Sequence, residues 1–460
     1  MSNSPLWTLA EIAAATGGTA HGTADISGLV IDSREAMSGD LFIPLKDKRD
    51  GHDFIPAAFK AGASASLSEI NIDEPHVRVD DSFKAMQDMA TAARRRSKAV
   101  RVGVTGSVGK TSIKEMIATI FEAHGASHKS VRSFNNHWGV PLTMARMPRE
   151  TQRAVFEMGM NHAGELSELS TFLQPDIALI SLIAPAHLAH FASVDDIAAA
   201  KAEIFDGLIM GGVAVLNKDD IYFEKFEATA TARQAKILSF GQDAEADVSL
   251  SNLRVATDKS TAQVNYLGQA YDLIIPAVGE HWLMNAAAAL AVAVASGIEL
   301  ASAIAALATY TIPAGRGVSF KAVIDGKDIT VLDESYNANP TSMRAAIASA
   351  SQQAKGRTIA VLGDMFELGK DELELHAALA PDIEAANISR VIFTGECMRA
   401  LRGELRRDIR GLWVANAQLA FDALRDEIVS EDTVLIKGSN ASGLGDLIHL
   451  IKPYKKGDET

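Results

Sequence analysis

The sequence predicts an α/β protein of three domains, and three observations lead to this prediction. The chain has 460 residues, and globular domains average about 150 residues. From residue 100 onward, apolar runs typical of strands alternate with helix-like segments, a pattern that favours parallel sheets covered by helices. The stretch Pro313-Ala-Gly-Arg-Gly317 has the composition of a linker. We therefore expect domains at residues 1–83, 84–313 and 314–460.

The first domain reads as a small α/β unit. Its last helix, Ser82–Arg95, leads into the second domain, and the basic run Arg94-Arg95-Arg96 is expected to be a solvated helix end. The remaining expected elements are helices at Leu9–Ala15 and Ala57–Ala61 and strands at Ile26–Ile31, Leu41–Leu45 and His76–Val79.

The second domain is expected to hold a mostly parallel sheet with an antiparallel annex and a buried Ala-rich helix, Trp282–Ala295. Its parallel strands are predicted at Val102–Val104, Ala154–Phe156, Ile177–Leu182 and Val213–Leu216, and those of the annex at Lys236–Phe240, Val248–Leu253 and Ala262–Tyr266. The third domain alternates in the manner of a Rossmann-like fold. Its strands are predicted at Ile329–Asp333, Thr358–Leu362, Arg390–Phe393, Leu412–Val414 and Thr433–Ile436.

Composition and charge exclude several classes of protein. A net charge of −14 makes nucleic acid an improbable partner, because phosphate backbones require a basic surface. Cys397 is the only cysteine, so the chain has no disulfide framework. The N-terminus does not resemble a signal peptide, and the longest apolar stretch, Ala286–Ala295, is too short to span a membrane. We expect a monomer in the cytoplasm, without membrane insertion.

The most specific motif is a phosphate-binding loop. The strand Val102–Val104 enters a Gly-rich turn that ends in Lys110 and Thr111 and continues as a helix. Backbone N–H groups in such a loop surround phosphate oxygens, Lys110 reaches the β- and γ-phosphates, and the Thr111 hydroxyl binds Mg²⁺. Val104 stands where the general pattern has its first glycine, so the loop is a variant. The residues expected to bind ATP here are Thr105, Gly106, Ser107, Gly109, Lys110 and Thr111.

Three further side chains are candidates for a metal site beside this loop. Glu157 ends a predicted strand and His187 follows another, so both are expected at the carboxyl edge of the sheet. Alternatively, Glu157 is a surface carboxylate and His187 is structural. Lys201 shares the apolar stripe of its helix with Ile197 and Ile204. It either extends its amine to solvent or is a chemically special lysine near the metal.

Two strand-end loops of the third domain carry polar residues. In Asp333-Glu-Ser-Tyr336-Asn337-Ala-Asn-Pro340 the first carboxylate is suited to ribose hydroxyls, although a turn ended by proline explains the same residues. Asp364 lies in the loop Leu362–Gly369, where it is either a site residue or the N-cap of a helix.

Taken together, the motifs resemble those of the Mur ligases, ATP-dependent amide-forming enzymes of peptidoglycan synthesis. The loop Thr105-Gly-Ser-Val-Gly-Lys-Thr111 is shared by all Mur ligases and by folylpolyglutamate synthases. Three motifs are more specific to the branch that adds D-Ala-D-Ala: Glu157-Met-Gly-Met-Asn161, Tyr336-Asn-Ala-Asn-Pro340 and Leu362-Gly-Asp-Met365. The other matching segments are Asp32-Ser-Arg34, Gly39–Leu45, Asp50–Phe54, Asn135-Asn136 with Gly139-Val-Pro141, Lys201–Phe205, Asn285-Ala-Ala and Gly315-Arg316.

The resemblance implies a role for each matched position. Glu157, His187 and Lys201 would hold metal together with Thr111, and Lys201 would be carbamylated. On the nucleotide, Asn285 would lie at the adenine side, Arg316 at the γ-phosphate and Asp333 at the ribose. The other residues it implies are Tyr336 and Asn337 for the nucleotide, Ser33 and Arg34 for the UDP end of the substrate, and Asn135, Asn136, Asn161 and Asp364 for the rest of the substrate.

The implied reaction joins D-Ala-D-Ala to UDP-MurNAc-tripeptide through an acyl phosphate, with ATP and Mg²⁺ as cofactors and the pentapeptide precursor as product. The run Lys437-Gly-Ser-Asn440-Ala-Ser-Gly-Leu-Gly-Asp446 departs from the family pattern, since it lacks an arginine and a Met-Glu pair. This departure places in doubt a role of the loop in holding the dipeptide carboxylate. Two alternatives stay open: another Mur-type amino-acid ligase, or a non-catalytic P-loop nucleotide-binding protein.

Overall fold

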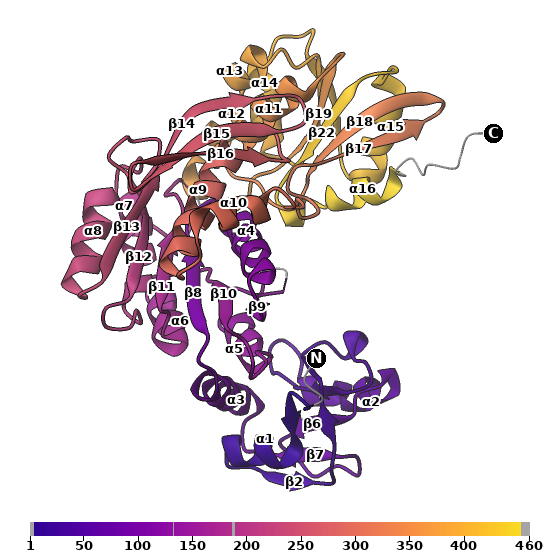
Figure 1. Ribbon diagram of the computed structural model, residues 1–460. Helices are drawn as coiled ribbons and strands as arrows, with labels where there is room; N and C mark the ends of the chain where they lie inside the picture. The colour runs from indigo at the N-terminus through magenta and orange to yellow at the C-terminus, as the bar shows by residue number, and fades with distance from the viewer. Residues whose placement is uncertain (1–3, 132, 186–188, 452–460) are drawn as a thin grey trace.

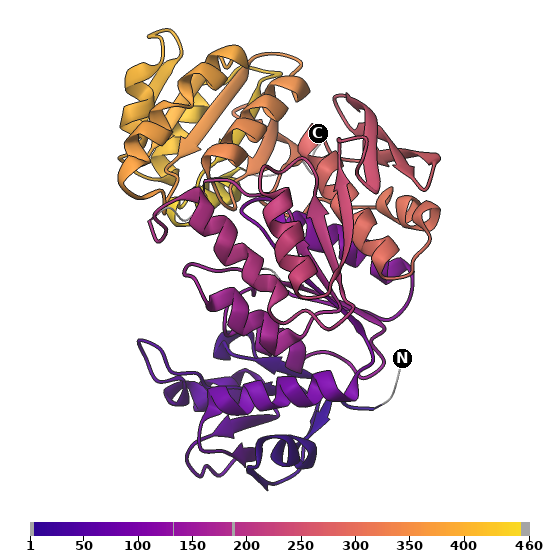
Figure 2. The ribbon, with the colours of Figure 1, turned by 90° about the vertical axis from the view of Figure 1, so that its left-hand side faces the viewer.

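The computed structural model describes residues 4–131, 133–185 and 189–451. It has three successive α/β regions, with the N-terminal and C-terminal regions on opposite sides of the central one (Figure 1). The turned view in Figure 2 shows the same order, with the N-terminal region below and the C-terminal region above. The predicted three-domain α/β fold is confirmed.

The N-terminal region has a five-stranded sheet, with a short pair of strands beside it. Helix α1 (Leu9–Thr16) begins at a capping box made by Thr8 and Glu11 and ends at Gly17, which is left-handed at φ 68°. The sheet order is β2 (Thr19–His21), β7 (His76–Arg78), β6 (Ala65–Ser68), β5 (Asp40–Phe42) and β4 (Gly28–Val30), and the extra pair is β1 (Trp7–Thr8) with β3 (Asp25–Ile26). Helix α2 (Ile55–Ala61) and the 3₁₀ turns Ser33–Glu35 and Gly51–Phe54 complete the region.

Helix α3 (Ser82–Arg96) joins this region to the central one, and its basic end is not the solvated run that the sequence predicts. Arg94 donates to the carbonyl of Phe172, and the Arg96 guanidinium lies 3.7 Å from the centroid of the Trp7 ring. Only Arg95 of the three is exposed. The prediction was wrong because carbonyls and an aromatic ring from distant segments pack against the other two arginines.

The central region contains one nine-stranded sheet that is parallel from β9 to β14 and antiparallel from β14 to β16. The segment at Lys236–Gly241 pairs in parallel with its neighbour, so it belongs to the main sheet and not to the predicted annex. The sheet order is β16 (Gln269–Ile275), β15 (Ser260–Tyr266), β14 (Val248–Val255), β13 (Lys236–Gly241), β12 (Val213–Asn217), β11 (Ile177–Ile180), β8 (Val100–Thr105), β10 (Arg153–Glu157) and β9 (Ser127–Lys129).

Helices cover both faces of this sheet, which is why its central strands read as almost continuous apolar runs. On one face Val102 and Val104 pack in a core with α4 (Lys110–Ala123), α9 (Glu280–Ala295) and α10 (Leu300–Leu307). The opposite face of the sheet packs against α5 (Gly139–Ala145), α6 (Glu165–Leu173), α7 (Val194–Ala202) with the 3₁₀ turn Glu203–Phe205, and α8 (Phe223–Ala232). The predicted buried helix is α9.

The C-terminal region has a six-stranded sheet that is parallel except for its first strand. Its order is β17 (Val318–Ile324), β18 (Lys327–Glu334), β22 (Thr433–Lys437), β19 (Thr358–Gly363), β20 (Arg390–Thr394) and β21 (Arg410–Val414). The helices are α11 (Pro340–Gln353), α12 (Glu372–Ala377), α13 (Ala380–Ala385), α14 (Met398–Glu404), α15 (Ala417–Glu427) and α16 (Gly445–Leu450), with 3₁₀ turns at Gly369–Asp371 and Asn440–Ser442. No helix within the described ranges has the length and apolar character that a membrane crossing requires.

Candidate active site

A cavity of about 690 Å³ lies between the central and C-terminal regions. Its walls come from the phosphate loop, the carboxyl ends of central strands, the first turns of α9, and the loop between β18 and α11. The predicted site residues that line it are Ser107, Gly109, Lys110, Thr111, Asn135, Asn136, Glu157, Asn161, Asn285, Arg316, Tyr336 and Asn337. The fold therefore brings together most of the residues that the sequence singled out.

The phosphate loop connects β8 to α4 and depends on two glycines. A Cβ at Gly106, where φ is +144°, would lie 1.9 Å from the Ser181 hydroxyl, and Gly109 begins α4 at φ +85°. Among the described residues, no side chain caps this helix, so its first N–H groups remain available to phosphate. Lys110 Nζ donates to the Gly106 carbonyl at 2.7 Å, and burial lowers the pKa of this amine. Thr105 is fully buried beneath the loop and does not line the cavity.

Glu157 lies at the end of β10, beside β8, and is 2% exposed. One carboxylate oxygen accepts a hydrogen bond from Thr111 Oγ1 at 2.7 Å. The other accepts from Asn135 Nδ2 at 2.9 Å. The alternative of a surface carboxylate is therefore wrong, because the parallel pairing of β10 with β8 places Glu157 under the phosphate loop.

Lys201 is 1% exposed, so its amine does not extend to solvent. Within the described ranges, its Nζ makes no hydrogen bond or ion pair. Burial, with the nearby charge of Lys110 as a second cause, holds the pKa of Lys201 well below its usual value. An amine in this position is favoured in its neutral, nucleophilic form. Lys201 is not part of the cavity wall, and His187 lies outside the described residues.

On the C-terminal side, the carboxylate that faces the cavity is Glu334 and not its neighbour Asp333. Asp333 accepts hydrogen bonds from the backbone of Gly315 at 3.0 Å and from the backbone and hydroxyl of Ser335 at 3.1 and 2.6 Å. Successive residues of a strand point to opposite sides, so only one of the two adjacent carboxylates can reach the cavity. The sequence pointed to Asp333 because it does not determine which side chains of β18 point toward the cavity.

Glu334 forms a buried pair with Lys437, whose Nζ lies 3.4 Å from its Oε2. Burial raises the pKa of Glu334 and lowers that of Lys437. His281, in the first turn of α9, also lines the cavity, and burial lowers its pKa to about 4. The sequence carried a weak signal for Lys437, which stands in the loop that departs from the family pattern. It carried none for His281.

Arg316 and Tyr336 lie against each other at the edge of the cavity. The Arg316 guanidinium carbon is 4.1 Å from the centroid of the Tyr336 ring. The Tyr336 hydroxyl donates to Ser133 Oγ, 2.6 Å away in the central region. Tyr336, from the C-terminal side, thus contacts the loop that carries Asn135.

Ser33 and Arg34 are not brought to this cavity. They form the 3₁₀ turn Ser33–Glu35 of the N-terminal region, where the Arg34 side chain is 87% exposed and pairs with Asp32 at 2.6 Å. This pairing lowers the pKa of Asp32 to about 2.

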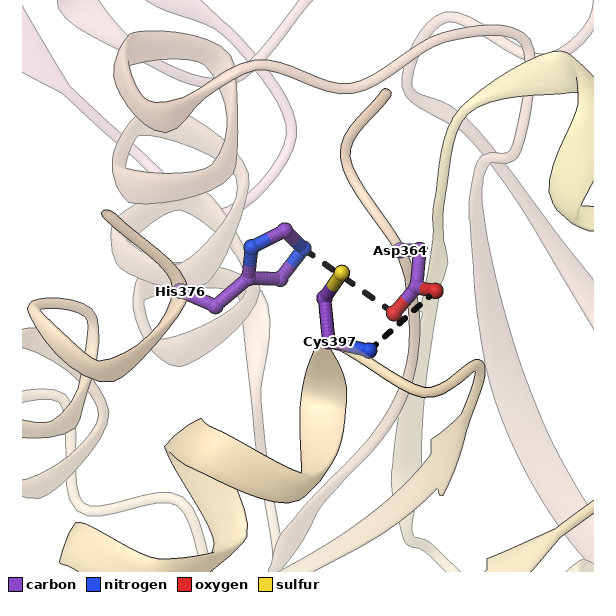
Figure 3. Close-up of side chains that lie close together, drawn as sticks. All are labelled: Asp364, His376 and Cys397. Atoms are coloured by element: carbon purple, nitrogen blue, oxygen red, sulfur yellow. Dashed lines mark hydrogen bonds and ion pairs between the residues drawn. The ribbon is translucent and has the colours of Figure 1, made fainter. Parts of the chain in front are cut away.

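Asp364 follows β19 and also lies away from the cavity. Its carboxylate accepts from the backbone of Met398 at 3.0 Å and of Cys397 at 3.4 Å, so it caps α14 and not the helix that follows it in sequence. His376 and Cys397 lie beside it (Figure 3). The backbone N–H of Met365 donates to Nε2 of His376, which places the proton on Nδ1, and Nδ1 donates to the Glu372 carbonyl at 2.6 Å. Both ring nitrogens are engaged, so this cluster fixes a loop and has no free imidazole ligand for a metal.

Comparisons with known proteins agree with this geometry. Residues 104–293 match the Mur ligase middle domain, and residues 320–440 match the Mur ligase glutamate ligase domain. The chain is 31% identical to UDP-N-acetylmuramoyl-tripeptide–D-alanyl-D-alanine ligase of Rickettsia prowazekii, with 96% of this chain and 99% of the relative covered. The chain belongs to the Mur ligases. The enzyme of the same name from Escherichia coli K12 is 32% identical, with 97% and 98% covered.

Solved structures place this Mur ligase with the D-Ala-D-Ala-adding branch, called MurF. A crystal structure of MurF from Acinetobacter baumannii superposes with a TM-score of 0.84 at 28% identity, covering 96% of this chain and 98% of the other. MurF from Thermotoga maritima in complex with ADP gives a TM-score of 0.77 at 25% identity, covering 92% and 96%. The resemblance drawn from the motifs is confirmed. This Mur ligase is an ATP-dependent amide ligase, which removes the alternative of a non-catalytic nucleotide-binding protein.

Proposed function

We propose that this Mur ligase adds D-Ala-D-Ala to UDP-MurNAc-tripeptide in the cytoplasm, with ATP converted to ADP and phosphate. The observation that carries this proposal is the shared cavity, where Lys110, Thr111 and Glu157 face Arg316 and Tyr336 across two regions of the chain. The near full-length similarity to ligases of that name supports the choice of substrates.

The first step transfers the γ-phosphoryl group of ATP to the terminal carboxylate of the tripeptide, which gives an acyl phosphate and ADP. Negative charge on the phosphoryl oxygens then needs stabilisation in a site that excludes water. Lys110 and the N-terminus of α4 supply positive potential on one side, and Arg316 supplies it on the other. These groups act by position and charge, and none forms a covalent bond to substrate.

The second step joins the amine of D-Ala-D-Ala to the acyl carbon. The neutral amine attacks, a tetrahedral intermediate forms, the nitrogen loses a proton, and phosphate leaves with the electron pair of the broken C–O bond and takes up a proton. Water would hydrolyse the acyl phosphate, so the cavity must close around it. The contact between the loop of Ser133 and the loop of Tyr336 is suited to that closure.

Mg²⁺ fits the oxygen donors beneath the phosphate loop. The Thr111 hydroxyl and the Glu157 carboxylate are adjacent, buried and oxygen-based, which is the donor chemistry that Mg²⁺ prefers. Mg²⁺ bound there would neutralise charge on the phosphate oxygens. We propose Thr111, Glu157, His187 and a carbamylated Lys201 as its holders. A neutral Lys201 amine would attack CO₂ and lose a proton, which would convert the neutral side chain into an anion able to bind the metal.

The nucleotide and substrate contacts remain proposals. Asn285 would contact the adenine side, and Tyr336 and Asn337 would lie near the nucleotide, since all three line the cavity. For the ribose, Glu334 is better placed than Asp333, whose oxygens are taken by its own loop. Ser33 and Arg34 would hold the UDP end, and Asn135, Asn136 and Asn161 would hold the tripeptide end. The geometry gives no support to a substrate contact by Asp364.

The test is a phosphate-release assay with UDP-MurNAc-tripeptides that differ in their third residue, each with and without D-Ala-D-Ala. We expect release that requires both substrates, with the pentapeptide product identified by mass spectrometry. Lys110→Ala is the negative control and should show no turnover, because it loses the lysine contact to phosphate. Release that is equally fast without D-Ala-D-Ala would contradict this function and favour another Mur-type ligase.

A further inference from the structure

Two hydroxyl groups join the walls of the cavity. Tyr336, two residues after β18, donates its hydroxyl hydrogen to Ser133 Oγ at 2.6 Å, although the two residues are 203 positions apart. Ser133 lies in the loop between β9 and α5 of the central region. Both side chains are half-buried and line the cavity.

On the C-terminal side, Tyr336 holds the turn that carries Arg316. Its backbone N–H donates to the Gly315 carbonyl at 3.0 Å, and its ring lies under the Arg316 guanidinium. Gly315 is left-handed at φ +75°, and a Cβ there would lie 2.9 Å from the Cβ of Tyr336. The turn and the tyrosine are thus closely packed, and the ring is in direct contact with the guanidinium.

On the central side, Ser133 is two residues before Asn135. The Asn135 carbonyl accepts from the backbone of Gly159 at 2.8 Å, and its side-chain amide donates to Glu157. The other oxygen of Glu157 accepts from Thr111 in the phosphate loop. Contacts therefore run from Arg316 to Tyr336 and Ser133, and from Asn135 to Glu157, with Ser133 and Asn135 two positions apart in the same loop.

We propose that Tyr336 is a positioning residue whose bond to Ser133 aligns Arg316 with the Asn135–Glu157 pair when the C-terminal region docks. The proposal rests on the proposed function, since it concerns the alignment of groups that act on the transferred phosphoryl group. The contrasting role is a direct nucleotide contact by the Tyr336 hydroxyl. A direct nucleotide contact would not depend on Ser133. The two roles of Tyr336 therefore predict different behaviour of the Ser133 variants.

The test compares Tyr336→Phe, Ser133→Ala and the double variant, with Ser133→Thr as the conservative form that keeps a hydroxyl. Tyr310→Phe is the matched control, because its hydroxyl is buried and has no partner within the described ranges. One hydrogen bond between neutral groups predicts a loss of kcat of about two- to tenfold in each single variant. The double variant should be no slower than the slower single variant, and Ser133→Thr and Tyr310→Phe should remain near wild type.

Three results would overturn the proposal. They are a wild-type kcat in Ser133→Ala, losses that multiply in the double variant, and a rise of only the KM for ATP in Tyr336→Phe. The last result would make Tyr336 a nucleotide ligand. Melting temperatures of the variants check that none has lost its fold.

A second measurement does not depend on turnover. Amide hydrogen exchange of residues 130–138 is measured in protein saturated with a non-hydrolysable ATP analogue. We expect faster exchange in Tyr336→Phe than in wild type or Tyr310→Phe, and equal exchange would overturn the proposal. If wild-type protein failed to release phosphate with D-Ala-D-Ala, the proposed function would fail, and the exchange data would still decide the role of the bond.

Discussion

Lys201 illustrates how burial changes the chemistry of one residue. Its place on the apolar stripe of α7 was visible in the sequence, and the structure buries the whole side chain. A charged amine without a partner is costly in such a site. The neutral form is therefore favoured, and this is the form that reacts with CO₂.

We expect Lys201→Ala to lower kcat by about 100-fold or more, because the proposed carbamate ligand of the metal is lost. Bicarbonate or a short carboxylic acid, which replaces the missing carboxylate, should restore part of the activity. Phosphate release with and without added acid measures both effects. Lys259→Ala, at an exposed turn, is the control and should behave as wild type. Full activity of Lys201→Ala without added acid would remove this lysine from the mechanism.

Other single residues mark the limit of reasoning from sequence. The identities of Lys110, Thr111 and Glu157 were predicted from a local motif and a strand end, and all three line one cavity. The sequence could not decide whether Asp333 or Glu334 lines the cavity, because this depends on which side of β18 faces the cavity. Asp364 carries a motif of the family, and yet its carboxylate caps a helix that begins more than thirty residues later.

At the level of elements, the edge strand β9 is attached to helix α5 through a histidine. His128 Nε2 donates to the Thr143 carbonyl at 2.7 Å. Burial, and secondarily the charge of Arg146, lowers the pKa of His128 to about 4, from an ordinary value of 6.5. The strand and the helix flank the loop that carries Ser133 and Asn135, so this attachment supports one wall of the cavity.

The lowered pKa of His128 predicts a pH dependence of stability. The unfolded chain binds a proton near pH 6.5 and the folded chain only near pH 4, so the stabilisation is complete above pH 6.5 and is lost as the pH falls toward 4. Relative to His128→Gln, wild type should lose about 2–3 kcal/mol of unfolding free energy between pH 6.5 and pH 4.5. Urea unfolding of both proteins at several pH values measures this difference. If the unfolding free energies of wild type and His128→Gln changed in parallel with pH, His128 would not titrate as described.

Elements with a strong pattern were predicted well, and those without one were missed. The buried strands of the central sheet and the Ala-rich helix α9 were found from apolar runs. Strand β6 has the sequence ASLS and is buried at every position, and neither alternation nor β-branched residues indicated it. The segment Lys236–Gly241 was identified as a strand, but its parallel partner β12 is defined only by the folded sheet.

At the scale of the whole molecule, the N-terminal region is hydrogen-bonded to the end of helix α5, which follows a loop of the cavity wall. The Trp7 indole donates to the Ala145 carbonyl at 2.9 Å, and Arg146 Nε donates to the Leu29 carbonyl at 2.7 Å. Both contacts are at the end of α5, whose preceding loop carries Asn135 and Asn136. A long substrate held at Ser33 and Arg34 would therefore be aligned with the cavity.

We expect Arg34→Ala to raise the KM for UDP-MurNAc-tripeptide by about tenfold or more, because the proposed charged hydrogen bond to its UDP end is lost. The KM for ATP should stay the same, since the phosphate loop belongs to another region. Steady-state kinetics with each substrate varied in turn measures both values. Arg95→Ala, an exposed arginine of α3, is the control. An equal rise in both KM values would mean that the substitution disturbs the fold and not one binding site.

The sequence by itself determined the α/β class, the phosphate loop, the family and the identities of most residues around the cavity. These are local properties, because a motif or an apolar run depends on neighbours along the chain. Only the tertiary structure decided that Glu334 faces the cavity, that Lys201 is fully buried, and that Tyr336 meets Ser133 across 203 positions. Such features depend on the facing of strands and the docking of regions, which are fixed by packing between segments far apart in the chain.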